Sequence, residues 1–447
     1  MMQDREALGG TAARDLALDC IEAGIEAGDP ERAIAESVSL DGDRLTIGET
    51  SYDLASYADV VVFGGGNAGG RMASAIEGVL GKRISRGVVV TDAPEETDRI
   101  EVLPGDHPVP SERGVESTRR MLELADDAAD DTLALVLVSG GGSALMPAPA
   151  EGITLSALQE VTEALLASGA EIGEINAVRK HCSAFKGGGL ARRAAPGTVV
   201  SLIVSDVIGN DLSTIASGPT APDATTFEEA KEVLSRYGID PPEAIASRLE
   251  RGAEGEVAET PDAEDPVFDR VDNHVIADGF SALEAVRDLA SERGSEPLIL
   301  SSSVRGEARE AAKTHVAIAE EVQRTGNPLA APAVVCSGGE TTVTLRGDGT
   351  GGPNQEFALA AAIELRGREG IALTAVDTDG IDGATDAAGA VVDGESVSDP
   401  ETARAALAEN DVYPYLEERD SLIETGATGT NVNDLRVLVI ANPEGSR

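Results

Sequence analysis

Two glycine-rich segments of this 447-residue chain could bind an anion, because each follows a run of apolar residues. The first spans residues 64–70 (GGGNAGG) and the second residues 139–143 (SGGGS). Backbone N–H groups in such loops can hold phosphate or carboxylate oxygens. A tight strand-to-helix turn would explain the first loop as well, but two such loops are harder to explain as turns alone. The candidate binding residues in them are Gly66, Asn67, Ser139, Gly141, Gly142 and Ser143.

Charged side chains in the middle of the chain have the chemistry to act on an anionic substrate. Residues 176–186 hold two of only five lysines, Lys180 and Lys186, together with Arg179. An ammonium group serves as a point charge for phosphate, although a solvated helix face would also explain the cluster. Asp206 follows the apolar run 199–204, and a carboxylate there could orient or deprotonate a substrate hydroxyl.

Closely spaced carboxylates in the last third of the chain suit a hard cation. The segment 377–383 (DTDGIDG) contains Asp377 and Asp379, which we predict to be ligands of Mg²⁺. This ion commonly binds through one or two carboxylates plus phosphate oxygens. Asp-Gly pairs are also ordinary turns, so the segment alone leaves both interpretations open.

The elements that must position these residues follow an α/β pattern. Buried strands are predicted around residues 60–63, 88–91, 133–138 and 199–204, with helices between them, which favours a largely parallel sheet. We predict further helices over 15–27, 154–167 and 176–194, and strand–helix units that begin near 275, 298, 334 and 373. The alternating segment 341–345 predicts an antiparallel edge strand, and the aperiodic segment 252–266 predicts a boundary or a surface excursion.

Composition excludes several classes of partner. Asp and Glu number 80 against 35 Lys and Arg, which gives a net charge of −45. This charge rules out a general basic surface for binding nucleic acid or an anionic membrane. No run approaches the ~18 apolar residues of a membrane span. Three cysteines without a CxxC pair, and an acidic N-terminus, predict a cytoplasmic protein. The acidity with scarce lysine resembles proteins of salt-accumulating cells; an ordinary acidic protein is the alternative.

Taken together, the motifs resemble the glycerate 2-kinase family. The resemblance covers nearly the whole chain, and its motifs occur in the family's order. In the first half they are 105–110 (GDHPVP), 139–145 (SGGGSAL), 176–181 with 186–188, and 205–220. In the second half they are 337–341 (SGGET), 354–357 (NQEF), 378–388 (TDGIDGATDAA) and 428–435 (TGTNVNDL).

The resemblance implies an activity, an architecture and a site. The family transfers the γ-phosphoryl group of ATP to the 2-hydroxyl of glycerate with Mg²⁺. It implies a Rossmann-like, DUF4147-type domain over 1–260 and a mixed α/β lobe over 267–447, with a MOFRL domain at about 333–440 and the active site in the cleft; a homodimer is compatible with it. The residues it adds to the predicted binding set are Arg179, Glu340, Asn354, Asn431 and Asn433.

Two positions depart from the family pattern. Asn67 stands where the first glycine loop usually carries a lysine, and Pro353 stands where the GGRNQE motif carries an arginine. Positioned cations stabilise a transferring phosphoryl group. Arg71 lies four residues after Asn67 and hence on the same helical face. We therefore predict a catalytic set in which cations other than the missing two carry this load: Arg71, Lys180 and Lys186, with Asp206 as candidate base.

Two other functions remain open at the level of sequence. Gly64, Gly66 and Gly69 satisfy GxGxxG and Asp92 closes the next apolar run, a layout typical of an NAD(P)H-dependent enzyme such as a hydroxypyruvate reductase. The missing lysine and arginine would suit a glycerate- or nucleotide-binding protein with weak or no catalysis.

Overall fold

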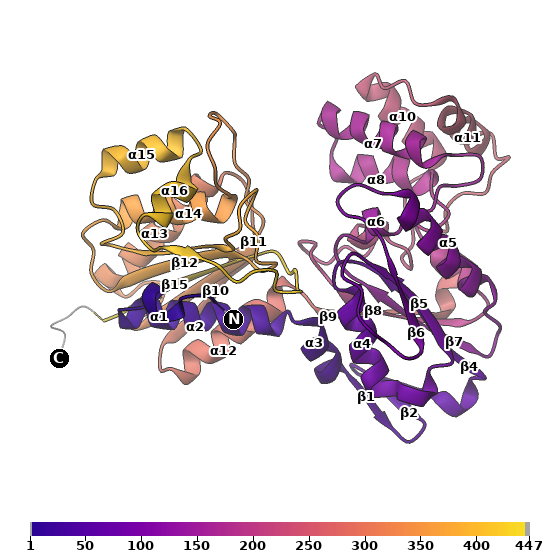
Figure 1. Cartoon of the computed structure of the whole chain (residues 1–447), viewed down its shortest axis with the longest axis horizontal. Helices are drawn as coiled ribbons and strands as arrows, with labels where there is room; N and C mark the ends of the chain where they lie inside the picture. Colours follow the sequence, from indigo (N-terminus) through magenta and orange to yellow (C-terminus); the bar gives the residue numbers. More distant parts are fainter. Residues whose placement is uncertain (1, 443–447) are drawn as a thin grey trace. The chain divides into compact units, whose positions relative to one another are not determined.

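The computed structural model describes residues 2–442, which form two compact units (Figure 1). One unit comprises Pro30–Ile276; the other combines Met1–Asp29 with Ala277–Arg447. Within the described residues no helix is both long and apolar enough to cross a membrane.

The unit Pro30–Ile276 is built on a six-stranded sheet of order β6-β5-β4-β7-β8-β9. Its strands are β4 (Asp59–Gly65), β5 (Arg86–Thr91), β6 (Ile100–Pro104), β7 (Thr132–Val138), β8 (Thr198–Val204) and β9 (Val271–Ala277). The pairs β4–β5, β4–β7, β5–β6 and β7–β8 are parallel, as predicted. Because the chain runs outward from β4 through β5 and β6 and then returns to β7, the strand order reverses between β4 and β7. Ligands of open α/β sheets bind at the carboxyl ends of strands at such a reversal.

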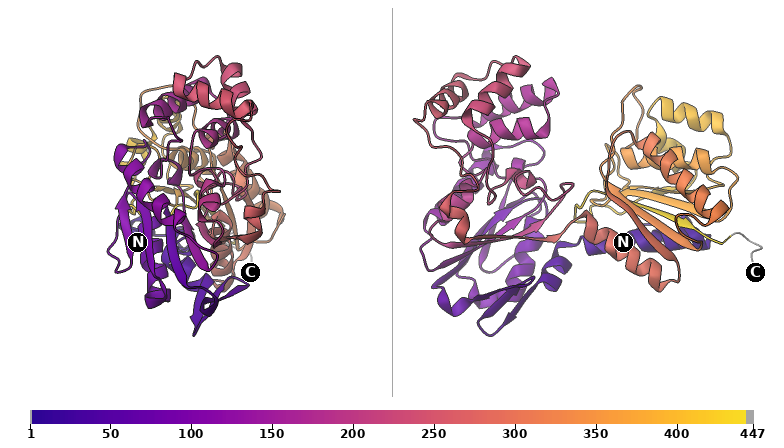
Figure 2. Two further views of the ribbon diagram at one scale, coloured as in Figure 1. Left: turned by 90° about the vertical axis from the view of Figure 1, so that its right-hand side faces the viewer. Right: turned by 180° about the vertical axis from the view of Figure 1, so that it is seen from behind.

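Helices complete this unit in two groups. The first group comprises α3 (Pro30–Ser37), α4 (Gly69–Leu80), α5 (Glu112–Asp126), α6 (Gly142–Leu145) and α9 (Gly189–Ala194). Those in the second group share a core of their own and are seen together, magenta to red, in Figure 2: α7 (Leu155–Ser168), α8 (Ile172–His181), α10 (Phe227–Tyr237) and α11 (Glu243–Ala253). A small antiparallel sheet comprises β1 (Val38–Asp41), β2 (Arg44–Ile47) and β3 (Thr50–Asp53). The predicted start of α7 is confirmed, since the Thr154 hydroxyl accepts a hydrogen bond from the amide of Ala157.

The predicted single helix over 176–194 is wrong. It is two helices, because α8 ends at His181 and α9 begins at Gly189. Gly187 and Gly188 have φ values of 54° and 74°, in the left-handed region that other residues avoid. The turn they form separates Lys186 from the start of α9.

The second unit has a mixed sheet of order β10-β11-β15-β12-β13-β14, in which only β10 and β11 are parallel neighbours. Its strands are β10 (Glu296–Val304), β11 (Ala333–Gly339), β12 (Ile371–Asp377), β13 (Gly389–Asp393), β14 (Leu422–Ile423) and β15 (Asp434–Ile440). One face carries α1 (Arg5–Leu8), α2 (Ala12–Ala27) and α12 (Gly279–Glu292) (Figure 1). The other carries α13 (Ala308–Thr325), α14 (Pro353–Leu365), α15 (Pro400–Ala408) and α16 (Val412–Glu417).

Two features of this unit differ from the sequence predictions. Residues 341–345 form no strand; Thr342 makes only an isolated parallel bridge to Glu307, and the Thr344 carbonyl accepts a hydrogen bond from Asn410. The N-terminal helix α2 packs its apolar residues, among them Leu18 and Ile21, into the core with β12 and β15. The first 29 residues therefore group with the C-terminal unit, and 252–266 lies inside the first unit rather than between units.

Candidate active site

The two predicted glycine loops meet at the carboxyl ends of β4 and β7. The amide of Asn67 donates to the carbonyl of Gly140 (2.9 Å), and the amide of Ala68 donates to the hydroxyl of Ser139 (3.1 Å). A Cβ on Gly66 would lie 2.2 Å from that hydroxyl oxygen. Ser139 is buried, so its hydroxyl holds the two loops together and is a positioning group rather than an open ligand contact.

The second loop carries two polar side chains directly against its backbone. A Cβ on Gly140 would lie 2.2 Å from Asp206 Oδ2, and a Cβ on Gly141 would lie 1.8 Å from Asn67 Oδ1. Gly141 also has a φ of 73°. An added side chain at either position would displace one of these polar groups. The loop 139–143 therefore has Asp206, which follows β8, against one glycine and Asn67, which follows β4, against the next.

Asn67 and Arg71 both have acidic partners. The side-chain amide of Asn67 donates to Asp92 Oδ2 (2.7 Å). Both Nε and Nη2 of Arg71 lie 3.1 Å from Glu31 Oε1, which comes from α3. Arg71 would have to leave this ion pair to reach a phosphoryl group, so its predicted catalytic role remains a prediction.

The two clustered lysines have different surroundings. Lys180 Nζ lies 3.2 Å from Asp223 Oδ1, and both side chains are almost completely buried. Its charge is neutralised inside the unit, which makes Lys180 a structural cation in this conformation. Lys186 Nζ donates to the Ser143 carbonyl (2.8 Å). Burial, with a smaller contribution from nearby Arg179, holds the pKa of Lys186 well below its ordinary value.

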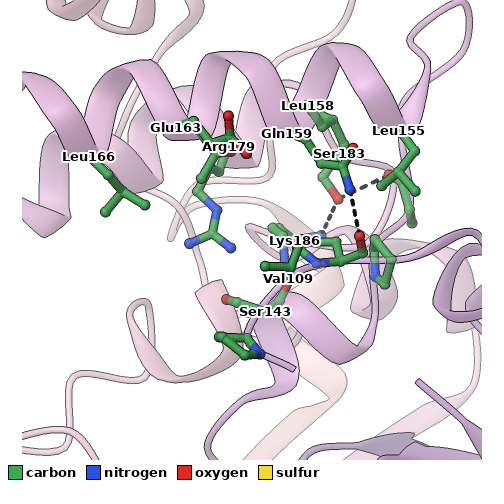
Figure 3. Close-up of a pocket in the computed structure, with 15 residues that line it drawn as sticks. Val109, Ser143, Leu155, Leu158, Gln159, Glu163, Leu166, Arg179, Ser183 and Lys186 are labelled. Atoms are coloured by element: carbon green, nitrogen blue, oxygen red, sulfur yellow. Dashed lines mark hydrogen bonds between the residues drawn. The ribbon is translucent and has the colours of Figure 1, made fainter. Parts of the chain in front are cut away.

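Arg179 is the third cation of this region and has no hydrogen-bond or ion-pair partner anywhere in residues 2–442. Burial lowers the pKa of its guanidinium group. Figure 3 shows this group between helix α7 and the segment that carries Ser143 and Lys186. The hydroxyl oxygens of Ser143 and Ser217 are 2.5 Å apart, which ties the glycine loop to the turn after β8. Arg179, Lys186 and Ser143 therefore line one pocket.

The predicted acidic residues gather at one edge of the mixed sheet. Asp434 begins β15 and pairs with Gly339 on one side and Asp377 on the other. Burial, followed by the charges of Asp379 and Asp434, raises the pKa of Asp377 to about 8. The pKa of Asp379 is also raised, chiefly by burial. These half-buried carboxylates repel one another, and a bound cation would relieve that repulsion.

This edge fits one kind of metal site. The described residues contain no group of three or more His, Cys, Asp or Glu side chains arranged to hold a metal ion. Asp377 and Asp379 alone supply two carboxylates. Mg²⁺ commonly takes one or two carboxylates and completes its shell with water and substrate phosphate, so the pair fits Mg²⁺ better than an ion that needs a full protein cage.

Beneath this edge lies a buried polar network that sequence reasoning missed. Asp434 forms an ion pair with Arg436 and accepts a hydrogen bond from the Asn354 side-chain amide (2.7 Å). Asp382 accepts hydrogen bonds from the backbone amides of Asn354 (3.0 Å) and Gln355 (2.9 Å). Asn354 is therefore an internal support. The available signal was Arg436 itself, a lone charge within the apolar run of β15.

The remaining predicted residues shape the loops around this edge. Glu340 is exposed, and its amide donates to the Val304 carbonyl (3.0 Å). The side chain of Asn431 accepts from the amide of Asn433 (3.0 Å), and Asn433 has a φ of 69°. Their backbone roles are thus clear, while ligand contacts by these three side chains stay predictions.

Comparison with known proteins supports one family. The family described as "Domain of unknown function (DUF4147)" matches residues 16–250, and the MOFRL family matches residues 333–434. D-glycerate 2-kinase of Thermotoga maritima is 41% identical over 96% of this chain and 98% of its own. A protein of Agrobacterium vitis, provisionally named a hydroxypyruvate reductase, is 43% identical over 85% of this chain and 87% of its own.

A solved structure extends the similarity to the fold. The crystal structure of glycerate kinase from Thermotoga maritima superposes with a TM-score of 0.85, at 41% identity, over 95% of this chain and 99% of that one. The resemblance predicted from the motifs is confirmed: the chain belongs to the glycerate 2-kinase family, with a DUF4147 domain followed by a MOFRL domain.

Proposed function

We propose that this protein is a glycerate 2-kinase that transfers the γ-phosphoryl group of ATP to the 2-hydroxyl of D-glycerate. One observation carries the proposal. Two interlocked glycine loops lie at the reversal of strand order between β4 and β7, and the carboxylate of Asp206 lies against the second loop. Family membership indicates which reaction such a site performs.

Each group has a role in this reaction. The 2-hydroxyl oxygen forms a bond to the γ-phosphorus while the bond from that phosphorus to the β,γ-bridging oxygen breaks, and ADP leaves. Asp206 orients the hydroxyl and accepts its proton. Backbone N–H groups of the glycine loops and the ammonium of Lys186 balance the charge of the phosphate and carboxylate oxygens.

Asp377 and Asp379 would hold Mg²⁺ in this proposal. The ion would neutralise phosphate charge, which positioned cations must do in any phosphoryl transfer. Burial, together with neighbouring acidic charge that includes Asp434 in both cases, raises the pKa of both carboxylates and supports the assignment. Asn354 and Arg436 hold the edge in place from below by fixing Asp434.

A second candidate is the NAD(P)H-dependent reduction of hydroxypyruvate. The GxGxxG spacing and the provisional name of the Agrobacterium vitis relative favour it. Asp92, which would accept a ribose hydroxyl in that function, already accepts a hydrogen bond from Asn67.

One experiment compares the two candidates. The purified chain is incubated in molar KCl, which screens its net charge, with ATP, Mg²⁺ and D-glycerate, and ADP and phosphoglycerate are followed. A parallel sample with NADH and hydroxypyruvate is followed by loss of NADH absorbance. The proposal expects equal amounts of ADP and 2-phosphoglycerate in the first sample and no change in the second. NADH oxidation without phosphoglycerate would overturn it, and binding without turnover in either sample would indicate a binding protein.

A further inference from the structure

The pocket that contains Arg179 and Lys186 has an apolar wall that glycerate does not require. Val109, Leu155, Leu158 and Leu166 line it alongside the two cations (Figure 3). Leu166 is 62% exposed and Val109 57% exposed, so apolar surface at the rim faces solvent. Large exposed apolar side chains that gather at a pocket containing polar groups mark a ligand site.

The charge of this pocket is unbalanced. Arg179 has no acidic partner within residues 2–442, and Lys186 donates only to a backbone carbonyl there. Glu163 is the acidic residue among the lining side chains, but it is exposed and lies outside ion-pair distance of either cation in the described chain. Two poorly neutralised cations in a chain with a net charge of −45 require an anion to complete them.

The loop 139–143 links this pocket to the proposed reaction centre, because Ser143 lines the pocket. Lys186 contacts the carbonyl of Ser143, at one end of the loop 139–143, and Asp206 lies against Gly140 near the other end. An acceptor bound along this loop could present its hydroxyl to Asp206 and its carboxylate to Lys186 and Arg179. A guanidinium group binds a carboxylate with two parallel hydrogen bonds, so Arg179 is suited to anchor the acid.

We infer that this pocket binds the carboxylate of the phosphoryl acceptor and that its apolar wall admits 2-hydroxy monocarboxylates with an apolar group at C3. The inference rests on the proposed function and deepens it, because it names the class of acceptor. Arg179 is the carboxylate anchor, and Leu158 and Leu166 contact the C3 substituent.

Binding without ATP tests the inference separately from catalysis. Isothermal titration calorimetry at constant molar KCl compares D-glycerate, D-2-hydroxybutyrate and glycerol, which lacks the carboxylate. The two acids are expected to bind competitively and glycerol not to bind. Arg179→Met is expected to weaken both acids by about 10- to 100-fold, the effect of losing a charged hydrogen bond, and Arg179→Lys by less. Arg120→Met, which removes an exposed arginine paired with Glu101, is the matched control and is expected to leave both affinities unchanged.

A second variant tests the apolar wall. Leu158→Gln is expected to weaken D-2-hydroxybutyrate more than D-glycerate. The inference is overturned if D-2-hydroxybutyrate does not compete, if Arg179→Met leaves D-glycerate affinity unchanged, or if Leu158→Gln weakens ATP instead of the acids. Failure of the proposed function is distinguishable, because the chain would then bind the acids as described without forming phosphoglycerate. Turnover with an acceptor KM insensitive to Arg179→Met would overturn the inference alone.

Discussion

The glycine-loop edge of the parallel sheet and the acidic edge of the mixed sheet both place polar groups at the ends of strands, but they differ in strand direction and in the balance of charge. The glycine loops follow the carboxyl ends of the parallel strands β4 and β7, whereas Asp377 ends β12 beside Asp434, which begins the antiparallel strand β15. At the first edge the cations Arg179 and Lys186 lack acidic partners in the described chain, whereas at the second Asp377 and Asp379 crowd together. From this difference we expect the first edge to bind an anion and the second to bind a cation.

The largest effect that would break this comparison is expected from Gly140→Ala. The added Cβ would lie 2.2 Å from Asp206 Oδ2 and displace the carboxylate. A displacement of about 1 Å can cost about 100-fold in rate, so kcat is expected to fall by about that factor while the melting temperature changes little. Gly78→Ala is the control, because a Cβ there meets no atom within 4 Å. Equal activity of the two variants would show that Asp206 does not take part.

Arg71→Ala tests whether Arg71 replaces the cation missing at Asn67. If it does, kcat falls by about tenfold, because the negative charge of the transferring phosphoryl group loses the stabilising guanidinium of Arg71. Glu31→Gln, which removes only the ion-pair partner, is the control and is expected to keep kcat unchanged. An unchanged kcat in Arg71→Ala would show that Arg71 serves only to pair with Glu31 of α3. An exposed ion pair of this kind contributes about 0–1 kcal/mol to the free energy of unfolding.

Lys186 is expected to make acceptor binding pH-dependent. Burial lowers its pKa, so the ammonium loses its proton at a lower pH than an exposed lysine does. The acceptor KM should rise several-fold as the pH increases through this lowered pKa. Lys186→Arg should flatten the profile, since a guanidinium group stays charged. A wild-type KM that is constant from pH 7 to 10 would contradict this role.

The acidic edge is expected to make the stability of the second unit depend on pH. Burial and like charges raise the pKa of Asp377 to about 8, and burial raises that of Asp382 to about 7. Both groups hold protons more tightly in the folded than in the unfolded chain. The free energy of unfolding should therefore decrease as pH rises from about 4, where unfolded aspartate ionises, to about 8.

Calorimetry with and without Mg²⁺ measures this effect. Each kcal/mol corresponds to about 2–4 °C in melting temperature for a unit of this size. Mg²⁺ should raise the melting temperature more at pH 8 than at pH 6, and Asp377→Asn should remove most of the difference. Asp348→Asn, at an exposed carboxylate of the same unit, is the control. A Mg²⁺ effect that survives in Asp377→Asn would place the ion elsewhere.

Sequence reasoning succeeded where local pattern and sheet geometry determine position. Apolar runs located β4, β7 and β8, and parallel pairing then brings the two glycine loops and Asp206 to one edge. The same reasoning located Asp377 and Asp379 at the carboxyl end of β12. No side-chain partner had to be known for these predictions.

The features that the sequence did not reveal depend on contacts between distant segments. The pairing of Lys180 with Asp223, which are 43 residues apart, leaves no local signal. The same holds for Arg71 with Glu31 and for α2, whose Leu18 packs in one core with Leu435. The separation of α8 from α9 depends on the left-handed glycines Gly187 and Gly188, and a Cβ at Gly188 would lie 2.5 Å from Pro261, which is distant in the sequence. The sequence revealed the cluster of cations. Only the fold shows that Lys180 is neutralised by Asp223, whereas Arg179 has no acidic partner in the described chain.

The central claim is tested most directly by a single-turnover measurement on Asp206→Asn. Enzyme in excess is mixed with γ-labelled ATP, Mg²⁺ and D-glycerate, and label in 2-phosphoglycerate is followed by rapid quench. The account predicts stoichiometric transfer in the wild type and a rate lower by about 10²–10⁴-fold in the variant, with ATP affinity unchanged. Transfer at the wild-type rate in Asp206→Asn, or no labelled 2-phosphoglycerate in the wild type, would contradict it.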